Sequence, residues 1–269
     1  MRLLFASDIH GSPRTWNALA GLAHECRPDA ILLGGDLFSN SAPVEAAPAA
    51  QRGEAGEPFA RWCAAAGAPV YWIAGNHEWA TTVDPPPGAG ICVHGRCVPL
   101  GDWDLIGFSL CSPTPYWLID HERREEFSTR REPRGRCWMS QGVLPAPVDN
   151  PNRWLDARPT LADELRALPA PRDWSRTVLM AHNPPFDTGL DLRWGNFPVG
   201  SADVREFILR VQPAISLHGH IHEAPLLSGS ATHRVGRTLG CNAGRSDAAI
   251  RALWIDLADP GVATLIERP

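Results

Sequence analysis

Residues 3–10 of the chain read LLFASDIH, a short apolar run followed by an aspartate and a histidine. A continuous apolar run of this length is typical of a strand that is buried on both faces of a sheet. Ser12 and Pro13 come next, in the order of an N-cap and a first helical residue, and apolar residues at helical spacing continue to Cys26 before Pro28. The chain therefore opens with a predicted strand, a polar loop and a helix over residues 13–26.

The same strand-and-loop unit recurs twice. Residues 30–33 (AILL) lead into Gly34-Gly35-Asp36, and residues 70–74 (VYWIA) lead into Gly75-Asn76-His77-Glu78. After Asp36 we expect an Ala-, Pro- and Gly-rich loop and then a helix over residues 57–66. This β-α-β-α-β series predicts a mostly parallel sheet with its functional site at the carboxyl ends of the strands.

Beyond residue 90 the pattern changes. The segment 112–155 is rich in Arg, Trp and Pro, and we interpret it as an insertion that caps a site or makes an oligomer contact. Because no internal repeat or linker is visible, we predict a single domain over residues 1–269. The other expected elements are strands over 91–100, 104–110, 177–181 and 214–217, helices over 120–129, 161–168 and 201–211, and short strands and turns from residue 224 onward.

Composition excludes several classes of function. The chain has 269 residues, a formal net charge of -5 and no lysine, so Schiff-base and P-loop chemistry are ruled out. The acidic balance disfavours a dedicated nucleic-acid binder. Seven scattered cysteines favour neither a zinc ribbon nor a disulfide framework. With no signal-peptide core and no run of about 20 apolar residues, we expect a soluble, cytoplasmic protein that does not insert into a membrane.

Five predicted strands each end in Asp, Asn or His. Carboxylate and amide oxygens together with imidazole nitrogens are the ligands that divalent cations accept, and a single Asp can bridge two cations about 3.5–4 Å apart. One such residue alone is weak support for a metal site, because turns and buried histidines explain it equally well. Together they predict a two-metal site. The residues concerned are Asp8, His10, Asp36, Asn76, His77, His182, His220 and His222.

The spacing within these motifs suits a shared site. Alternate residues of a strand point to the same side, so Asp8 and His10 can face one ion, and His220 and His222 can do the same. A glycine precedes Asp36, and others precede Asn76 and His220. Glycine allows the backbone to turn tightly beside the ions.

These motifs, in this order, resemble the complete signature of the calcineurin-like metallophosphoesterases. They are Asp8-Ile9-His10, Gly35-Asp36, Gly75-Asn76-His77-Glu78, His182 and Gly219-His220-Ile221-His222. The resemblance implies an α/β fold, a four-layer α/β/β/α sandwich of two facing mixed β-sheets flanked by helices. It also implies a dinuclear centre of two divalent metal ions, for which we expect Mn, with Fe, Zn, Ni and Co as alternatives.

The resemblance also implies a role for each ligand. Asp8, His10 and His222 would hold the first ion, Asn76, His182 and His220 the second, and Asp36 would bridge them. A hydroxide that bridges the ions would attack phosphorus in line. His77 would orient the phosphate or protonate the leaving oxygen, so Asp36 and His77 are the expected catalytic residues.

The motifs leave three further features open. Glu78 is either a partner of a metal-binding histidine or a solvated or capping residue. His218 lies in the core or behind the ligands. Trp117, Trp138 and Trp194 are candidates to line a substrate slot, although buried packing is the default for tryptophan.

The resemblance is strongest to the small metallophosphoesterase-domain proteins associated with cyclic-nucleotide and other phosphodiester hydrolysis. The Asp-Arg-Gly motif of the serine/threonine phosphatases is absent after Asp36, and Ser39 stands where the repair nucleases have a histidine. We therefore expect a phosphodiesterase with monoesterase activity as a side reaction, whose partner is a small phosphodiester such as a cyclic nucleotide.

Two alternatives from other classes remain. One is a nucleic-acid-processing nuclease, which the six arginines within residues 123–136 would favour if they formed a basic stripe; interleaved glutamates favour a salt-bridged helix face instead. The other is a non-catalytic interaction scaffold on the same fold. The sequence leaves the oligomeric state undetermined.

Overall fold

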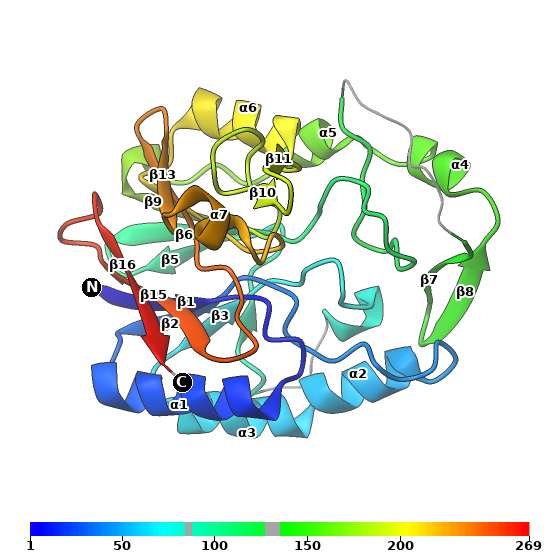
Figure 1. The fold of residues 1–269 in the computed structure, drawn as a ribbon, viewed down its shortest axis with the longest axis horizontal. Coiled ribbons are helices and arrows are strands. Elements are labelled where there is room, and N and C mark those ends of the chain that lie inside the picture. Colours follow the sequence, from blue (N-terminus) through cyan, green and yellow to red (C-terminus); the bar gives the residue numbers. More distant parts are fainter. Residues whose placement is uncertain (84–87, 127–134, 269) are drawn as a thin grey trace.

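Two six-stranded sheets stack face to face in the computed structural model, with helices on both outer faces (Figure 1). The structure describes residues 1–83, 88–126 and 135–268. The order of the first sheet is β16-β15-β1-β2-β3-β4, and the order of the second is β13-β14-β12-β9-β6-β5. This is the four-layer arrangement of two mixed sheets that the family resemblance implies.

The first sheet is parallel in its middle and antiparallel at one side. Strands β1 to β4 run parallel, with Leu3 of β1 opposite Ala30 of β2, whereas β15 pairs antiparallel with β1 and β16 antiparallel with β15. The tail of the chain thereby encloses β1 within the sheet. The strands are β1 (Arg2–Ala6), β2 (Ala30–Leu33), β3 (Val70–Trp72), β4 (Ile91–Cys92), β15 (Ile250–Asp256) and β16 (Ala263–Arg268).

The second sheet has a parallel centre and an antiparallel strand at each edge. Strands β14, β12, β9 and β6 run parallel, and β13 and β5 pair antiparallel with β14 and β6. Its strands are β5 (Cys97–Leu100), β6 (Trp103–Phe108), β9 (Thr177–Ala181), β12 (Ile215–His218), β13 (Thr232–Val235) and β14 (Thr238–Asn242).

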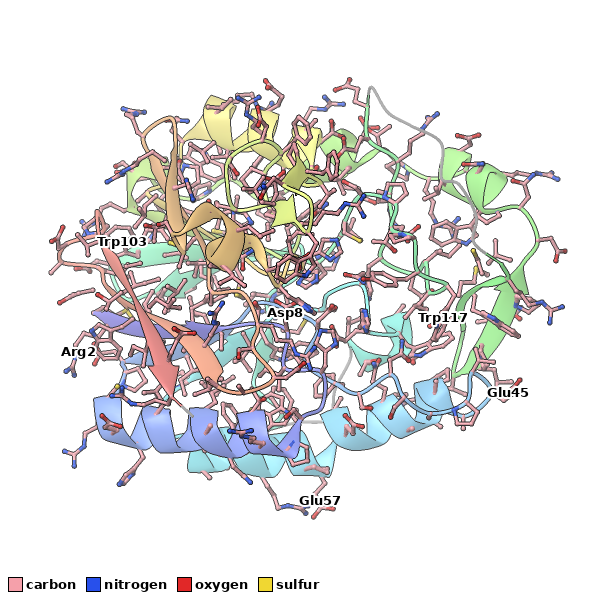
Figure 2. The ribbon with its side chains drawn as sticks, viewed as in Figure 1. Arg2, Asp8, Glu45, Glu57, Trp103 and Trp117 are labelled. Atoms are coloured by element: carbon pink, nitrogen blue, oxygen red, sulfur yellow. The ribbon has the colours of Figure 1, made fainter. Side chains whose placement is uncertain are left out.

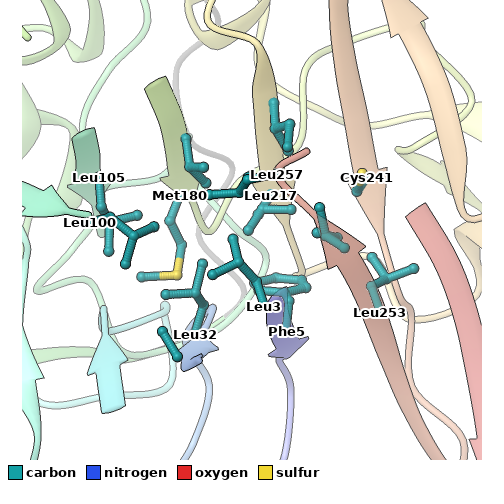
Figure 3. Close-up of a cluster of buried hydrophobic side chains, with 14 of the residues drawn as sticks. Leu3, Phe5, Leu32, Leu100, Leu105, Met180, Leu217, Cys241, Leu253 and Leu257 are labelled. Carbon is teal, nitrogen blue, oxygen red and sulfur yellow. The ribbon is translucent and has the colours of Figure 1, made fainter. Parts of the chain in front are cut away.

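Alternation along each strand creates the layers. Leu3 and Phe5 of β1 point between the sheets and meet residues such as Met180 of β9, and side chains fill this layer (Figures 2 and 3). Leu4 and Ala6, one residue out of phase, face the helices instead. All these side chains are fully buried, which explains why the strands read as unbroken apolar runs. Each buried Leu or Phe contributes roughly 1.5–3 kcal/mol.

Helices cover both outer faces. On the first sheet lie α1 (Pro13–Cys26), α2 (Ala47–Ala55) and α3 (Glu57–Ala65), and on the second lie α5 (Leu161–Arg166) and α6 (Ala202–Val211). The start of α1 is as predicted, because the Ser12 hydroxyl accepts a hydrogen bond from the Thr15 N–H at 3.2 Å. Helix α2 was expected to be loop; its alanines favour a helix, Pro48 is tolerated in the first turn, and Gly53 lies near the end.

The predicted single strand over residues 91–100 is wrong. It is divided between the sheets, with β4 at the edge of the first and β5 at the edge of the second. The chain crosses from one to the other at a turn where Gly95 has φ +67°. It passes so close to Gly107 of β6 that a Cβ there would lie 2.6 Å from the Val93 carbonyl oxygen.

The predicted helix over residues 120–129 is also wrong for residues 120–126; residues 127–129 lie outside the described part. Residues 120–126 form turns and a single bridge. The acidic side chains there accept hydrogen bonds from distant backbone: Asp120 binds the N–H groups of Ala80 and Ser140, and Glu122 binds that of Thr114. These hydrogen bonds hold residues 120–126 in an irregular conformation, and a helix could not provide them.

Smaller elements complete the described chain. Within the segment 112–155 they are β7 (Cys137–Gln141), β8 (Leu144–Val148) and α4 (Pro151–Asp156), and elsewhere β10 (Leu192–Arg193), β11 (Phe197–Pro198), α7 (Ala224–Ser228) and the single 3-10 turns Ala80–Thr82 and Trp174–Arg176. Among the described helices, none combines the length and the apolar character that crossing a bilayer requires.

His218 lies in the core. It is fully buried, with Nδ1 2.8 Å from the Ala181 carbonyl oxygen and Nε2 2.9 Å from the Ser216 hydroxyl. Burial lowers the pKa of His218 from 6.5 to about 4. The unfolded chain therefore takes up a proton at this residue before the folded chain does, and stability is lost as the pH falls from 6.5 towards 4.

We predict that His218→Gln makes the free energy of unfolding less dependent on pH. Urea unfolding at pH 7 and pH 5, with chelator present, should show a shallower loss for the variant than for the unsubstituted protein. The exposed His24→Gln on α1 is the control and should keep the original slope. An unchanged slope in His218→Gln would show that this residue does not cause the acid sensitivity.

Candidate metal centre

All eight predicted site residues lie together at the carboxyl ends of parallel strands. They follow β1, β2 and β3 of the first sheet and β9 and β12 of the second, near the centre of the molecule where Figure 2 labels Asp8. Three groups of three have potential ligand atoms within 4.8 Å of one another: Asp8, His10 and His222; His10, Asp36 and His77; and Asp8, Asp36 and His182.

Asp36 stands between two halves of this cluster. Its Oδ1 atom lies 3.4 Å from Nε2 of His182, and its Oδ2 atom lies 3.8 Å from Nε2 of His10 and 4.0 Å from Nε2 of His77. Oδ1 also accepts a hydrogen bond from the His77 N–H at 2.9 Å. The two oxygens thus face different histidines, which is the arrangement that a bridging ligand needs.

One half of the cluster contains Asp8, His10 and His222. Asp8 Oδ1 is 3.3 Å from Nε2 of His222, which is 3.2 Å from Nε2 of His10. Ligand atoms around one cation with bonds of about 2.0–2.2 Å lie about 3–3.5 Å apart. The donor set and its spacing therefore fit a divalent cation.

The other half contains His182, Asn76 and His220. The Asn76 Oδ1 atom is 3.2 Å from Nε2 of His182, and the ring of His220 lies 5.2 Å from that of His182. His182 places Nδ1 2.8 Å from the Gly34 carbonyl oxygen. Donation from Nδ1 to that carbonyl fixes the tautomer and leaves Nε2 free to bind a metal.

Four of these residues have a backbone conformation that side chains rarely adopt. Asp8, His10, Asp36 and His220 have φ of 57°, 51°, 53° and 67°. Left-handed conformations cost roughly 1–3 kcal/mol each and persist only where the surroundings enforce them. This left-handed conformation directs the side chains that follow the strands toward one another.

Two glycines make room for the carboxylates. A Cβ on Gly75 would collide with Oδ1 of Asp36 and with Nε2 of His182, and a Cβ on Gly219 would collide with Asp8 and with Ser7. The Ser7 hydroxyl donates to Oδ2 of Asp8 at 2.5 Å, and the His220 N–H donates to Oδ1 at 3.1 Å. The glycines of the motifs therefore serve close packing around the ligands.

Glu78 takes neither of the roles that the sequence left open. Its buried carboxylate accepts four backbone hydrogen bonds, from the N–H groups of Asp36, Leu37, Phe38 and Gly75 at 2.6–3.1 Å. Burial and the charge of Asp36 raise the pKa of Glu78, while the N–H donors oppose the rise. Glu78 thereby joins the loop after β2 to the loop after β3.

Asn242 supports the last motif in a similar way. Its amide donates to the carbonyl oxygens of Leu190, Gly219 and Ile221, and its Oδ1 accepts from the Gly244 N–H. It thus holds the loop that carries His220 and His222. From residue 224 onward the sequence predicts only short strands and turns.

Burial and the neighbouring charges shift the pKa values of the site's histidines in opposite directions. Burial lowers the pKa of His10 to about 4 and that of His220 to about 3. Burial acts the same way on His182, but Asp36 outweighs it and raises the pKa of His182 to about 9. The pKa of each carboxyl, Asp8 and Asp36, is lowered because facing histidines outweigh burial. Both carboxylates thus stay ionised, and ionised carboxylates attract cations.

A cavity of about 380 Å³ opens over the cluster. Of the three tryptophans proposed for a substrate slot, Trp117 lines it, Trp138 packs beside Leu118, and Trp194 is exposed on the β10–β11 hairpin. The sequence did not single out Tyr116 or Arg245. The lining residues are His10, Asp36, Ser39, Asn40, Ser41, Asn76, His77, Tyr116, Trp117, His220, His222 and Arg245.

Comparison with known protein families identifies the family of this chain. The family model for calcineurin-like phosphoesterases matches residues 1–224. The chain belongs to the calcineurin-like phosphoesterase family, a family of metallophosphoesterases, as the motifs predict. A search of curated proteins found no match.

Solved structures agree on the fold. The structure of TT1561 of Thermus thermophilus is similar, with a TM-score of 0.58 and 17% identity over 99% of this chain and 98% of that one. A structure of an archaeal phosphodiesterase gives a TM-score of 0.48 and 9% identity over the full length of both chains. At these identities the likeness concerns the fold, and the second score is too low to support an argument.

We predict that Glu78→Gln destabilises the protein strongly. The amide replaces one acceptor oxygen by a donor that faces backbone N–H groups, and each buried group left unpaired costs about 1–3 kcal/mol. Urea unfolding should therefore show a loss of several kcal/mol. Glu54→Gln is the matched control, because Glu54 accepts a single bond, from the Ser39 N–H, which an amide oxygen can also accept. Equal effects of the two substitutions would contradict this role for Glu78.

Proposed function

We propose that the chain is a dinuclear metal-dependent phosphoesterase that hydrolyses phosphodiesters. The observation that carries the proposal is the position of Asp36, whose two oxygens face His182 on one side and His10 on the other. Asp8, His10 and His222 would hold one ion, and Asn76, His182 and His220 the other. We propose Mn²⁺ as the metal, with Fe, Zn, Ni and Co as alternatives, and a cytoplasmic location.

Two divalent cations at this site would lower the pKa of a bound water and neutralise the charge of the phosphate. The chain supplies the rest. Asp36 keeps both halves of the ligand set in register, and the strained loops hold the ligands in place before substrate arrives. Little rearrangement is then needed during the reaction.

His77 is suited to proton transfer to the leaving oxygen. Its Nε2 lies 4.0 Å from Asp36, and its ring contacts those of His10 and Tyr116 at 4.6 and 5.4 Å. It lines the cavity and is partly exposed, so a substrate can reach it. A residue beside the ligands that also faces the cavity fits a general acid better than a further ligand.

We further propose that residues 1–269 act as one domain and that the segment 112–155 caps the site. Tyr116 and Trp117 of this segment line the cavity, and Leu118 and Trp138 pack beside Trp79, one residue beyond Glu78. These contacts anchor the segment next to the ligands.

The arginines of this segment do not favour the nuclease alternative where they are described. Arg123 pairs with Glu164 at 3.0 Å, Arg124 with Asp156 at 3.1 Å, and Arg136 lies over Trp138. Arg130, Arg131 and Arg134 lie outside the described residues. The described arginines therefore pair with acidic or aromatic side chains of the molecule, as the salt-bridged interpretation expects, and do not form a basic stripe.

We predict metal-dependent hydrolysis of bis(p-nitrophenyl) phosphate. Protein stripped with a chelator should be inactive, and Mn²⁺ should restore release of p-nitrophenol with two ions bound per chain. Metal binding is measured by mass spectrometry after gel filtration. If none of Mn, Fe, Zn, Ni or Co binds or restores turnover, the scaffold interpretation replaces this one. Steeply salt-dependent binding of DNA or RNA would favour the nuclease.

We predict that two substitutions separate metal binding from proton transfer. His77→Ala should keep two metal ions and lower kcat for a diester with an alkoxide leaving group, such as a cyclic nucleotide, by a factor on the order of 10²–10⁴, because it removes only the proton donor. Hydrolysis of bis(p-nitrophenyl) phosphate, whose p-nitrophenolate leaves without a proton, should fall much less. Asp36→Asn should abolish activity and loosen both ions. The exposed His24→Ala serves as control. Loss of metal from His77→Ala would show that His77 is a ligand instead.

A further inference from the structure

The cavity over the metal centre has two unlike ends. The ring of Tyr116 lies 5.4 Å from that of His77, which lies 4.6 Å from His10, and His10 lies 5.1 Å from His222. Beside the last ring of this row, the backbone N–H of Arg245 donates to the His222 carbonyl oxygen at 3.1 Å. The lining therefore has an aromatic end, Tyr116 and Trp117, next to His77, and a cationic end, Arg245, next to His222.

Arg245 brings a fixed positive charge to the described lining of the cavity. Since the chain has no lysine, every fixed positive side-chain charge is an arginine. Among the described residues that line the cavity, Arg245 is the one with such a charge. The guanidinium lies close enough to His222 to oppose the rise in the pKa of that histidine.

The partner of Arg245 is easily replaced. Its Nη2 atom lies 2.8 Å from Oδ1 of Asp247, whose side chain is 87% exposed. An ion pair of this kind contributes at most about 1 kcal/mol. A phosphate, which can accept two hydrogen bonds from one guanidinium, competes well with it.

The aromatic end rests on partly or fully buried side chains. Tyr116 is 51% exposed, and its N–H donates to the Thr114 hydroxyl, which in turn donates to the buried Glu122 carboxylate at 2.7 Å. The ring of Trp117 packs on that of Trp79 at 5.7 Å. Both aromatic residues are thus held in place while they face the cavity, which suits them to stack on a flat ring.

We propose that the substrate is a nucleotide-type phosphodiester that carries an aromatic ring on one side of the reacting phosphorus and a second phosphate on the other. This rests on the proposed function, since the reacting phosphorus is placed over the metal ligands. The ring occupies the Tyr116–Trp117 end, and the second phosphate binds Arg245. A cyclic mononucleotide, with a single phosphate, leaves the Arg245 end unused.

The test compares two chromogenic substrates that differ by one phosphate. These are thymidine 5′-(p-nitrophenyl phosphate) and the same compound with a 3′-phosphate. In both, water adds to phosphorus and p-nitrophenolate leaves. We expect kcat/KM to be about tenfold higher for the 3′-phosphate compound, mainly through KM, which is the effect of one charge-assisted contact. Arg245→Gln should remove this preference, which is read as the ratio of the two kcat/KM values in the same variant.

Control variants make the comparison specific. Arg245→Lys keeps the charge and should retain part of the preference. Arg61→Gln, on the exposed face of α3, should retain all of it. Tyr116→Ala should raise KM for both compounds, and Tyr116→Phe, which keeps the ring, should not. A preference that survives in Arg245→Gln, or no preference in the unsubstituted protein, overturns the assignment.

A binding measurement separates this inference from the proposed function. Calorimetry with thymidine 3′,5′-bisphosphate and thymidine 5′-phosphate needs no turnover. The Arg245 site is supported if the bisphosphate binds more tightly than the monophosphate and if Arg245→Gln abolishes this difference. This holds even if neither chromogenic compound is hydrolysed, and in that case only the proposed activity fails. Equal binding of both nucleotides overturns the Arg245 site whatever the activity.

Discussion

The buried Glu78 carboxylate holds together the part of the structure on which the site depends. It binds four backbone N–H groups from the loops after β2 and β3, so the positions of Asp36 and Asn76 are fixed relative to each other. These loops contain strained residues, and without such an anchor the strain would relax. On the opposite sheet Asn242 does the same for the loop of His220 and His222. Two buried polar side chains that form hydrogen bonds with backbone N–H and C=O groups thus hold the candidate ligands in place.

Much of the fold was predictable because its signals are local. The unbroken apolar runs of β1, β2 and β9 reflect burial on both faces, and the Ser12 cap marks the start of α1. The split of residues 91–100 between two sheets was not predictable, because it depends on the close passage of the chain beside Gly107. The irregular course of residues 120–126 likewise depends on remote backbone groups that bind Asp120 and Glu122.

The same distinction applies to the candidate site. The eight candidate site residues were found from residue type and spacing, and the structure brings all of them together. Residues that support or extend the site are less evident in the sequence. The sequence leaves Glu78 open between a partner of a metal-binding histidine and a solvated or capping residue, and Arg245 is one of 25 arginines in the chain. Their roles depend on what lies opposite them in space, which a single sequence does not encode in any local motif.

The candidate metal ligands and the other walls of the cavity therefore belong to different parts of the chain. The candidate ligands follow interior strands, and the tail strand β15 encloses β1, so these positions tolerate little movement. The cavity walls come from Tyr116 and Trp117 in an irregular segment and from Arg245 in a loop after β14. Walls of this kind can change in length and chemistry without disturbing the sheets. The Arg245 guanidinium and the aromatic pair, Tyr116 and Trp117, are thus the features by which this chain would select among phosphodiesters on a shared metal centre.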